Sequence, residues 1–132
     1  MKWTHLIIGL LVFVMFVVTG QYMSLDFPDK DAMSQELRVL MRSRHIYILF
    51  SALIHLVLGA YIQISLPRWR QILQYSGSVV LLFSSALLVW AFFVETYSTQ
   101  HNSSISFFGI ILSLAGVGLH LIGGLAKGNT DR

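Results

Sequence analysis

The side chains in this sequence that could do chemistry are mainly its five histidines. His5, His55 and His120 lie inside long apolar stretches, whereas His45 and His101 lie near the ends of such stretches. A neutral imidazole can give or take a proton, and it can bind a metal ion or a haem iron. Because an imidazole among apolar groups must find a hydrogen-bond partner, each of the first three is either a structural contact or a working site.

His55 is the most informative of them, because it falls near the middle of its apolar stretch. In the structural interpretation, its neutral ring forms a hydrogen bond with Ser84 or Ser85 on the next stretch. In the functional interpretation, it exchanges protons as part of a transport pathway. The same alternatives hold for His120, which lies on a glycine-rich face. His5 is expected at a depth similar to that of His120, but close to water.

A haem held between two histidines requires both ligands at nearly the same depth. His55 is ten residues and His120 fifteen residues from the outer ends of their stretches, and at ~1.5 Å per residue these depths differ by roughly 7 Å. His5 matches His120 better in depth but is expected nearer to water. The chain also lacks cysteine, a His-x3-His pair and a carboxylate cluster. We therefore predict no metal site and no cofactor.

The motifs of the common enzyme classes are missing from the sequence. It contains no Ser-His-Asp set, no glycine-rich phosphate loop, no HExxH and no acidic pair. We therefore predict no catalytic residues and no enzyme. The net charge of +3 is small and does not indicate nucleic-acid binding.

The elements that must position the histidines are four apolar stretches, at about 3–20, 45–66, 72–94 and 105–126. Each is close to the ~20 residues that cross the hydrocarbon core of a bilayer. Hydrophobic residues make up 55% of the chain and charged residues only 11%, whereas a soluble domain carries about 25% charged residues. The sequence therefore predicts an all-α polytopic membrane protein, in which residues 1–132 form a single transmembrane domain with four spans in an antiparallel bundle.

The connection at 21–44 is the only long one. Its second half, 33–44, has apolar residues at helical spacing, and Ser34 is a suitable N-cap. We expect a short amphipathic helix there, which either lies on the membrane surface or leads directly into the second span. Residues 68–70, after Pro67, are expected to form a tight turn into the third span.

The first apolar stretch allows a second interpretation. Lys2, the apolar residues after it and the small residues near 18–20 also resemble a secretory signal peptide with its cleavage site. The stretch is long for such a peptide and three more spans follow, so an uncleaved first span is favoured.

Small residues mark the helix faces that we expect to pack inside the bundle. In the fourth stretch, residues of one such face recur at steps of four, three, four and three: Gly109, Ser113, Gly116, His120 and Gly123. Gly59 lies on a similar face of the second stretch, together with His55.

Glu95 ends the third stretch on the side where Arg44 precedes the second. A carboxylate at a helix C-terminus opposes the helix dipole, so a cationic partner would stabilise it. We predict an ion pair between Glu95 and Arg44, with His45 as an alternative partner; the other alternative is a solvated carboxylate.

The positions of lysine and arginine weakly favour an orientation with both termini in the cytoplasm, at the inner cell membrane. In this orientation five basic residues lie inside, Lys2, Arg68, Arg70, Lys127 and Arg132, and four lie outside, Lys30, Arg38, Arg42 and Arg44. The last connection carries no lysine or arginine, which fits an outer loop.

Three functions are compatible with these features. The first and favoured one is an accessory or structural component that lies in the lipid bilayer and binds another membrane protein or a second copy of itself. The second is a small oligomeric transporter or channel that uses His55. The layout is similar to that of the small multidrug resistance family, but residues 3–20 lack the glutamate on which that family relies. The third is a membrane subunit whose histidines bind haem or a metal.

Overall fold

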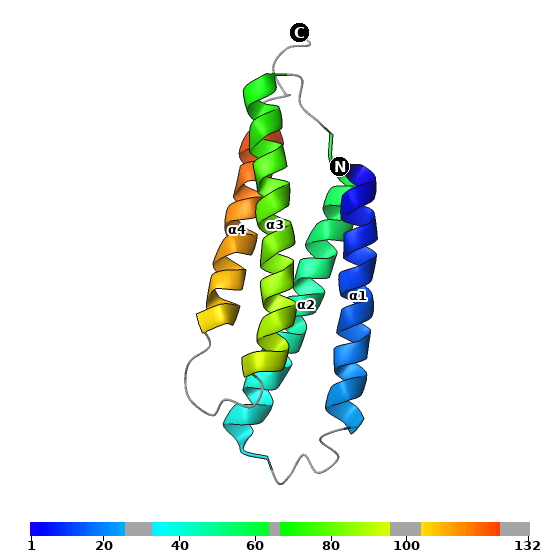
Figure 1. The fold of residues 1–132 in the computed structure, drawn as a ribbon, viewed down its shortest axis with the longest axis vertical. Helices are drawn as coiled ribbons and strands as arrows, with labels where there is room; N and C mark the ends of the chain where they lie inside the picture. The colour runs from blue at the N-terminus through cyan, green and yellow to red at the C-terminus, as the bar shows by residue number, and fades with distance from the viewer. Residues whose placement is uncertain (26–32, 64–66, 96–103, 125–132) are drawn as a thin grey trace.

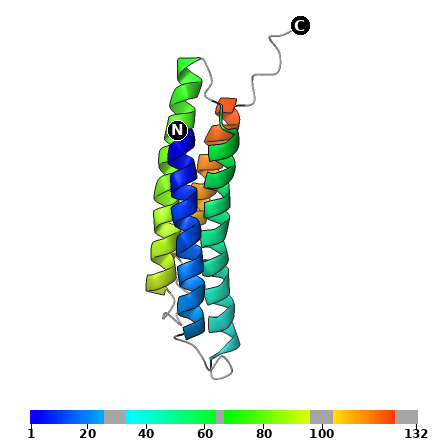
Figure 2. The same ribbon diagram turned by 90° about the vertical axis from the view of Figure 1, so that its right-hand side faces the viewer.

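The computed structural model describes residues 1–25, 33–63, 67–95 and 104–124. They form four α-helices: α1 (Lys2–Leu25), α2 (Gln35–Tyr61), α3 (Arg68–Glu95) and α4 (Ser104–Gly124). The helices run alternately down and up along one axis, as Figures 1 and 2 show. The predicted all-α four-helix bundle is confirmed, and each helix is long and apolar enough to cross a membrane.

The bundle consists of two closely packed helix pairs. α1 packs along α2, α3 packs along α4, and contacts between α2 and α3 join the two pairs. No Cα atom of α1 lies within 8 Å of one in α4. We call the end at which α1 and α3 begin and α2 and α4 end the N-terminal end of the bundle (Figure 1).

α2 begins well before the second apolar stretch. The Ser34 side chain accepts a hydrogen bond from the Leu37 backbone nitrogen at 3.3 Å, so Ser34 is the N-cap. The helix then continues without a break to Tyr61. The predicted amphipathic segment at 33–44 therefore leads directly into the second apolar stretch, which was one of the two arrangements expected.

Two predicted boundaries at the N-terminal end are wrong. α2 ends at Tyr61, before the expected end of the second stretch, and residues 68–70 form the first turn of α3 rather than a tight turn. Pro67 explains the second difference. Its carbonyl accepts hydrogen bonds from the backbone nitrogens of Arg70 and Gln71, at 3.0 and 3.2 Å, and a proline, which has no N–H, is well suited to the start of a helix.

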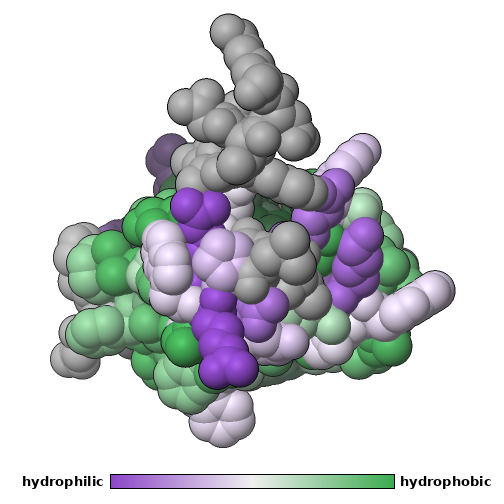
Figure 3. Space-filling view, turned by 90° about the horizontal axis from the view of Figure 1, so that it is seen from above, coloured by the Kyte–Doolittle hydropathy of each residue, from purple (hydrophilic) through white to green (hydrophobic). Residues whose placement is uncertain are grey.

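The distribution of side chains is the reverse of that in a soluble bundle. Among the described residues, thirteen polar or charged residues are buried against nine hydrophobic ones, while large apolar side chains such as Leu11 and Phe83 are about 60% exposed. Figure 3 shows hydrophilic residues gathered at the N-terminal end and hydrophobic residues along the sides. An apolar exterior around a polar interior suits a protein whose sides face lipid rather than water.

Glycines set the distance between α1 and α2. A Cβ atom added to Gly59 would lie 2.8 Å from the backbone nitrogen of Leu6, and one added to Gly9 would lie 2.9 Å from the backbone nitrogen of Leu56. Real side chains do not approach a backbone so closely, so the two helices touch backbone to backbone at these positions.

The predicted face of α4 packs against α3. A Cβ atom added to any of three α4 glycines would lie 2.6 to 2.8 Å from an α3 side chain. These glycines are Gly109, Gly116 and Gly123. At Gly116 the neighbours are Leu81 Cγ at 2.6 Å and the Gly77 carbonyl oxygen at 3.1 Å. Ser113, on the same face, is buried as well.

Gly116→Ala and Gly118→Ala form a matched pair of tests on α4. An added Cβ at Gly118 meets nothing within 4 Å, and alanine is favoured over glycine in a helix by up to ~1 kcal/mol. We expect Gly118→Ala to be neutral or stabilising, and Gly116→Ala to lower the free energy of unfolding by about 1–3 kcal/mol, because the new methyl overpacks against Leu81. Thermal unfolding in detergent, followed by circular dichroism, measures both effects. Equal effects would contradict the close approach at Gly116.

Candidate functional site

The three histidines of the apolar stretches meet toward the N-terminal end of the bundle. His5 Nδ1 lies 2.8 Å from His55 Nδ1, and the two rings stack with their centroids 5.0 Å apart. The ring of His120 meets that of His5 edge-on, at a centroid distance of 5.7 Å. All three lie in the interior, with exposed fractions of 1% for His5, 0% for His55 and 7% for His120. The structure thus joins side chains from α1, α2 and α4.

Serines extend this cluster in both directions. Ser78 Oγ lies 2.9 Å from His5 Nε2 and 3.2 Å from His120 Nε2. On the other side, Ser85 Oγ lies 2.8 Å from His55 Nε2 and 2.6 Å from Ser51 Oγ. The result is one hydrogen-bonded chain across all four helices, which we call the His–Ser chain: Ser51, Ser85, His55, His5, Ser78 and His120.

The glycine contacts described above place the two central histidines side by side. Gly59 lies against the backbone nitrogen of Leu6, which directly follows His5. Gly9 lies against the backbone nitrogen of Leu56, which directly follows His55. Because the two backbones touch there, the rings before those leucines fall at one level and within hydrogen-bond distance.

A glycine on α3 has the corresponding effect on the other helix pair. Gly77 directly precedes Ser78, and a Cβ added to Gly77 would lie 3.0 Å from His120 Cδ2. Sequence reasoning missed Ser78. The signal that could have found it is its separation of seven residues from Ser85, which puts both serines on one face of α3.

His55 forms its hydrogen bond with Ser85, one of the two serines predicted as partners. Ser84, the other one, donates to the Gly109 carbonyl at 2.7 Å and lies 2.5 Å from Ser113 Oγ. These contacts join α3 to α4 separately from the His–Ser chain.

The expected depths of the histidines are wrong in one respect. His5 lies level with His120, as expected, since their rings are in contact, and its side chain is 1% exposed. His55 and His120 are not separated in depth as expected, since both rings contact that of His5. The reason is that α2 ends at Tyr61, which places His55 closer to the N-terminal end than the sequence suggested.

The geometry of the histidines does not fit a metal ion between them. A metal with ligand distances of about 2.0–2.1 Å would hold two imidazole nitrogens more than ~3 Å apart, whereas His5 Nδ1 and His55 Nδ1 are 2.8 Å apart and share a hydrogen bond. Within the part of the chain that the structure describes, no group of three or more His, Cys, Asp or Glu side chains could hold a metal ion.

Two hollows reach the His–Ser chain from outside. A cavity of about 330 Å³ lies at the N-terminal end between α2, α3 and α4, and His120 lines it together with Gln63 and Gln74. An apolar groove of about 520 Å³ runs between α1 and α3, and Ser85 lines it. His55 lines neither of them. The two ends of the His–Ser chain therefore lie closer to the surface of the bundle than its centre does.

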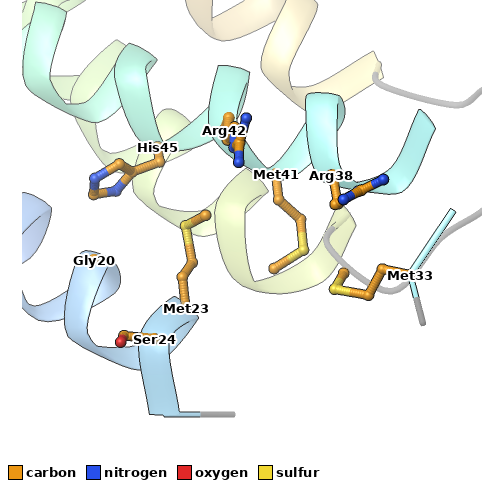
Figure 4. Close-up of a pocket in the computed structure, with 8 residues that line it drawn as sticks. All are labelled: Gly20, Met23, Ser24, Met33, Arg38, Met41, Arg42 and His45. Carbon is orange, nitrogen blue, oxygen red and sulfur yellow. The ribbon is translucent and has the colours of Figure 1, made fainter. Parts of the chain in front are cut away.

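His45 belongs to a separate region at the opposite end of the bundle. Its Nδ1 lies 3.1 Å from Thr19 Oγ, and its ring stacks on Phe16 at a centroid distance of 4.1 Å. It lines a cavity of about 190 Å³ between α1 and the start of α2, where Met23 and Met41 extend into the space between the helices (Figure 4). The other lining residues are Gly20, Ser24, Met33, Arg38 and Arg42. His101 lies outside the described residues.

Arg44 and Glu95 form a buried ion pair at this opposite end. Arg44 Nε lies 3.3 Å from Glu95 Oε2, and Arg44 Nη1 donates to the Glu95 carbonyl at 2.5 Å. The Glu95 carboxylate also accepts hydrogen bonds from the Ile105 backbone nitrogen at 2.8 Å and from Ser106 Oγ at 2.5 Å. It therefore caps the N-terminus of α4 while it holds α2 against α3.

No known protein family matches the chain, and searches of curated proteins and of solved structures find no similar protein. The inference of function therefore depends on the geometry of the site.

The contact between His5 and His55 predicts the protonation of both rings. Two nitrogens that share a hydrogen bond need one N–H and one lone pair. With both rings neutral, we expect opposite tautomers, one ring protonated at Nδ1 and the other at Nε2. ¹⁵N NMR of histidine-labelled protein in bilayers distinguishes the tautomers. The same neutral tautomer in both rings would contradict the contact.

The ion pair predicts unequal roles for two arginines on α2. Arg44→Met leaves the buried Glu95 carboxylate without its charged partner, which costs about 3–5 kcal/mol of stability. Arg42→Met is the control, because Arg42 is exposed, and we expect a change within ~0.5 kcal/mol. Unfolding of both variants in detergent measures the difference. An Arg44→Met protein as stable as Arg42→Met would show that the pair does not hold the helices together.

Proposed function

We propose that the chain is an integral membrane protein that crosses the bilayer four times and works as an accessory or partner-binding component of a membrane assembly. The observation that carries the proposal is the contrast between a polar interior, linked by hydrogen bonds, and apolar sides. The helices have 24, 27, 28 and 21 residues, which corresponds to lengths of about 31–42 Å, against ~30 Å of hydrocarbon.

The charges support an orientation with the N-terminal end of the bundle in the cytoplasm. Lys2, Arg68 and Arg70 lie at that end, and residues 125–132, which follow α4 in sequence, contain two more basic residues. At the opposite end, Arg44 is neutralised by Glu95. The excess of basic charge that marks the cytoplasmic side is therefore larger than the residue counts alone indicate.

The packing of α1 supports its role as a permanent part of the bundle rather than a removable signal. His5 forms hydrogen bonds to α2 and to α3. Without α1, His55 Nδ1 and one contact of Ser78 would lose their partner, at a cost of several kcal/mol for buried polar groups in hydrocarbon.

The sealed centre of the bundle supports an accessory role over transport through His55. His55 is fully buried and hydrogen-bonded on both ring nitrogens. α1 has the smallest fraction of buried residues of the four helices, with four of 24 against ten of 28 for α3. A largely uncovered apolar helix can associate with another membrane protein or with a second copy of the chain.

A small oligomeric transporter is the second candidate, and one observation favours it. His120 lines the cavity at the N-terminal end and is connected to His55 through Ser78 and His5. A polar path therefore leads from one face of the bundle toward its centre.

Fractionation and native purification test the proposal. We expect the chain to stay in the membrane pellet after alkaline carbonate extraction. After solubilisation in mild detergent, we expect it to migrate as a complex larger than its own 14.9 kDa plus the detergent micelle, with the partner identified by mass spectrometry. Release by carbonate would contradict the membrane assignment. A strictly monomeric protein, with no discrete cross-linked product in intact membranes, would contradict the partner-binding role.

A further inference from the structure

We propose that the cavity between α1 and the start of α2 binds a soft monovalent metal ion, copper(I). The ligands are His45 Nε2 and the sulfur atoms of three methionines that line the cavity, Met23, Met33 and Met41. Methionine was not among the side chains on which the predicted absence of a metal site rested. Copper binding does not depend on the accessory role proposed above.

The first support is the protonation of the His45 ring. The Thr19 hydroxyl donates to the carbonyls of Met15 and Phe16, at 2.9 and 3.0 Å. Because its single proton is used there, its oxygen accepts from His45 Nδ1, which lies 3.1 Å away. A neutral His45 therefore carries its proton on Nδ1 and keeps a lone pair on Nε2. Histidine ligands in metal sites have this arrangement, with the second ring nitrogen donating to a neighbouring group.

The second support is the position of that lone pair. A Cβ atom added to Gly20 would lie 3.3 Å from His45 Cε1 and 3.5 Å from His45 Nε2. Both Gly20 and His45 line the cavity, and because glycine has no side chain, this edge of the ring is left open toward it. Among the described residues, Thr19 is the hydrogen-bond partner of His45, and it takes Nδ1. The Nε2 lone pair is therefore available to a ligand in the cavity.

The third support is the gathering of methionines around the same space. Three of the five methionines of the chain line the cavity. Met41 precedes His45 by four residues, so both lie on one face of α2. Figure 4 shows Met23 of α1 and Met41 of α2 extending into the space between the helices. Thioether sulfur is a soft, uncharged donor, and soft donors select copper(I).

The cavity distinguishes these methionines from ordinary packing residues. In a helix contact, methionine usually fills an irregular gap, because its unbranched side chain has three rotatable bonds. Here the methionines surround a cavity of about 190 Å³ that they leave unfilled. The same flexibility allows their sulfur atoms to turn toward an ion in the cavity while the helices stay in place.

The charges around the cavity favour a monovalent ion. Arg38 and Arg42 also line it, and among the residues that the structure describes no carboxylate does. A divalent ion meets twice the repulsion of a monovalent ion at the same distance from a guanidinium, and imidazole and thioether ligands do not neutralise it. Arg42 is exposed, and a long side chain of this kind can turn its charge toward water. We therefore expect copper(I) rather than Cu²⁺ or Zn²⁺.

The experiment measures copper(I) binding to the full chain in detergent, under ascorbate, by competition with a coloured copper(I) chelator. We expect one ion per chain, with sulfur and nitrogen neighbours of the copper in X-ray absorption spectra. Met23→Leu removes one sulfur at nearly constant volume, and we expect the affinity to fall by about tenfold or more. Met15→Leu is the matched control, because both methionines lie on α1 and pack against the same buried cluster, while only Met23 lines the cavity.

Two results of this experiment would overturn the proposal. One is a chain that takes no copper(I) from the chelator. The other is an equal affinity in Met23→Leu and Met15→Leu, which would mean that copper binds elsewhere or adventitiously. Zn²⁺ should bind at least tenfold more weakly than copper(I), and tighter binding of zinc would also overturn the assignment. Circular dichroism checks that the variants keep the helical content of the wild type.

A second measurement tests the histidine ligand without any substitution. Silver(I) has the charge and softness of copper(I) and does not change its oxidation state here. In ¹⁵N NMR of the histidine-labelled chain in bilayers, we expect silver(I) to shift His45 Nε2 and to leave Nδ1 protonated. Shifts at His5, His55 or His120, with none at His45, would overturn the proposal. Metal binding needs no partner protein, so its failure and the failure of the accessory role give different results.

Discussion

The structure depends on the approach of backbone to backbone at a few glycines. Gly9 and Gly59 bring α1 against α2, and Gly77 and Gly116 bring α3 against α4. Imidazole and hydroxyl side chains are short, so hydrogen bonds between helices form only where the helix axes are close. A larger residue at any of these glycines would separate a pair of helices. The His–Ser chain is thus a consequence of the glycine contacts, and its polar groups in turn stabilise the same contacts.

The polar interior is stable because nearly every group in it is paired. A polar group left alone in an apolar surrounding costs several kcal/mol. In the His–Ser chain each serine hydroxyl has several partners. Ser78 Oγ donates to the Gln74 carbonyl and contacts two histidines, and Ser85 Oγ donates to the Leu81 carbonyl and contacts His55 and Ser51. His120 Nδ1 is the exception among the described residues of this chain. Such exceptions are rare in buried interiors.

The sequence was sufficient to predict the number and type of the helices, because apolar runs of about 20 residues leave few alternatives. It also located the packing face of α4, since Gly109, Gly116 and Gly123 recur at helical spacing. It could not place His5 beside His55. That contact depends on where α2 ends and on which helices pair, and neither property is encoded within a single apolar stretch. Ser78 was missed for the same reason, because its partners lie on two other helices.

The two ends of the bundle use polar groups in opposite ways. At one end, Arg44 and Glu95 carry opposite charges, and Glu95 additionally accepts hydrogen bonds from the first turn of α4. Charges of fixed sign permit a single arrangement there, so that end is locked. At the N-terminal end, the His–Ser chain contains only imidazole and hydroxyl groups, each of which can donate or accept a hydrogen bond. The Ser78 and Ser85 hydroxyls donate to the backbone carbonyls of Gln74 and Leu81, one turn earlier on α3, and contact the histidines of the other helices. The four helices are thus joined by an ion pair at one end of the bundle and by hydrogen bonds among imidazole and hydroxyl groups at the other.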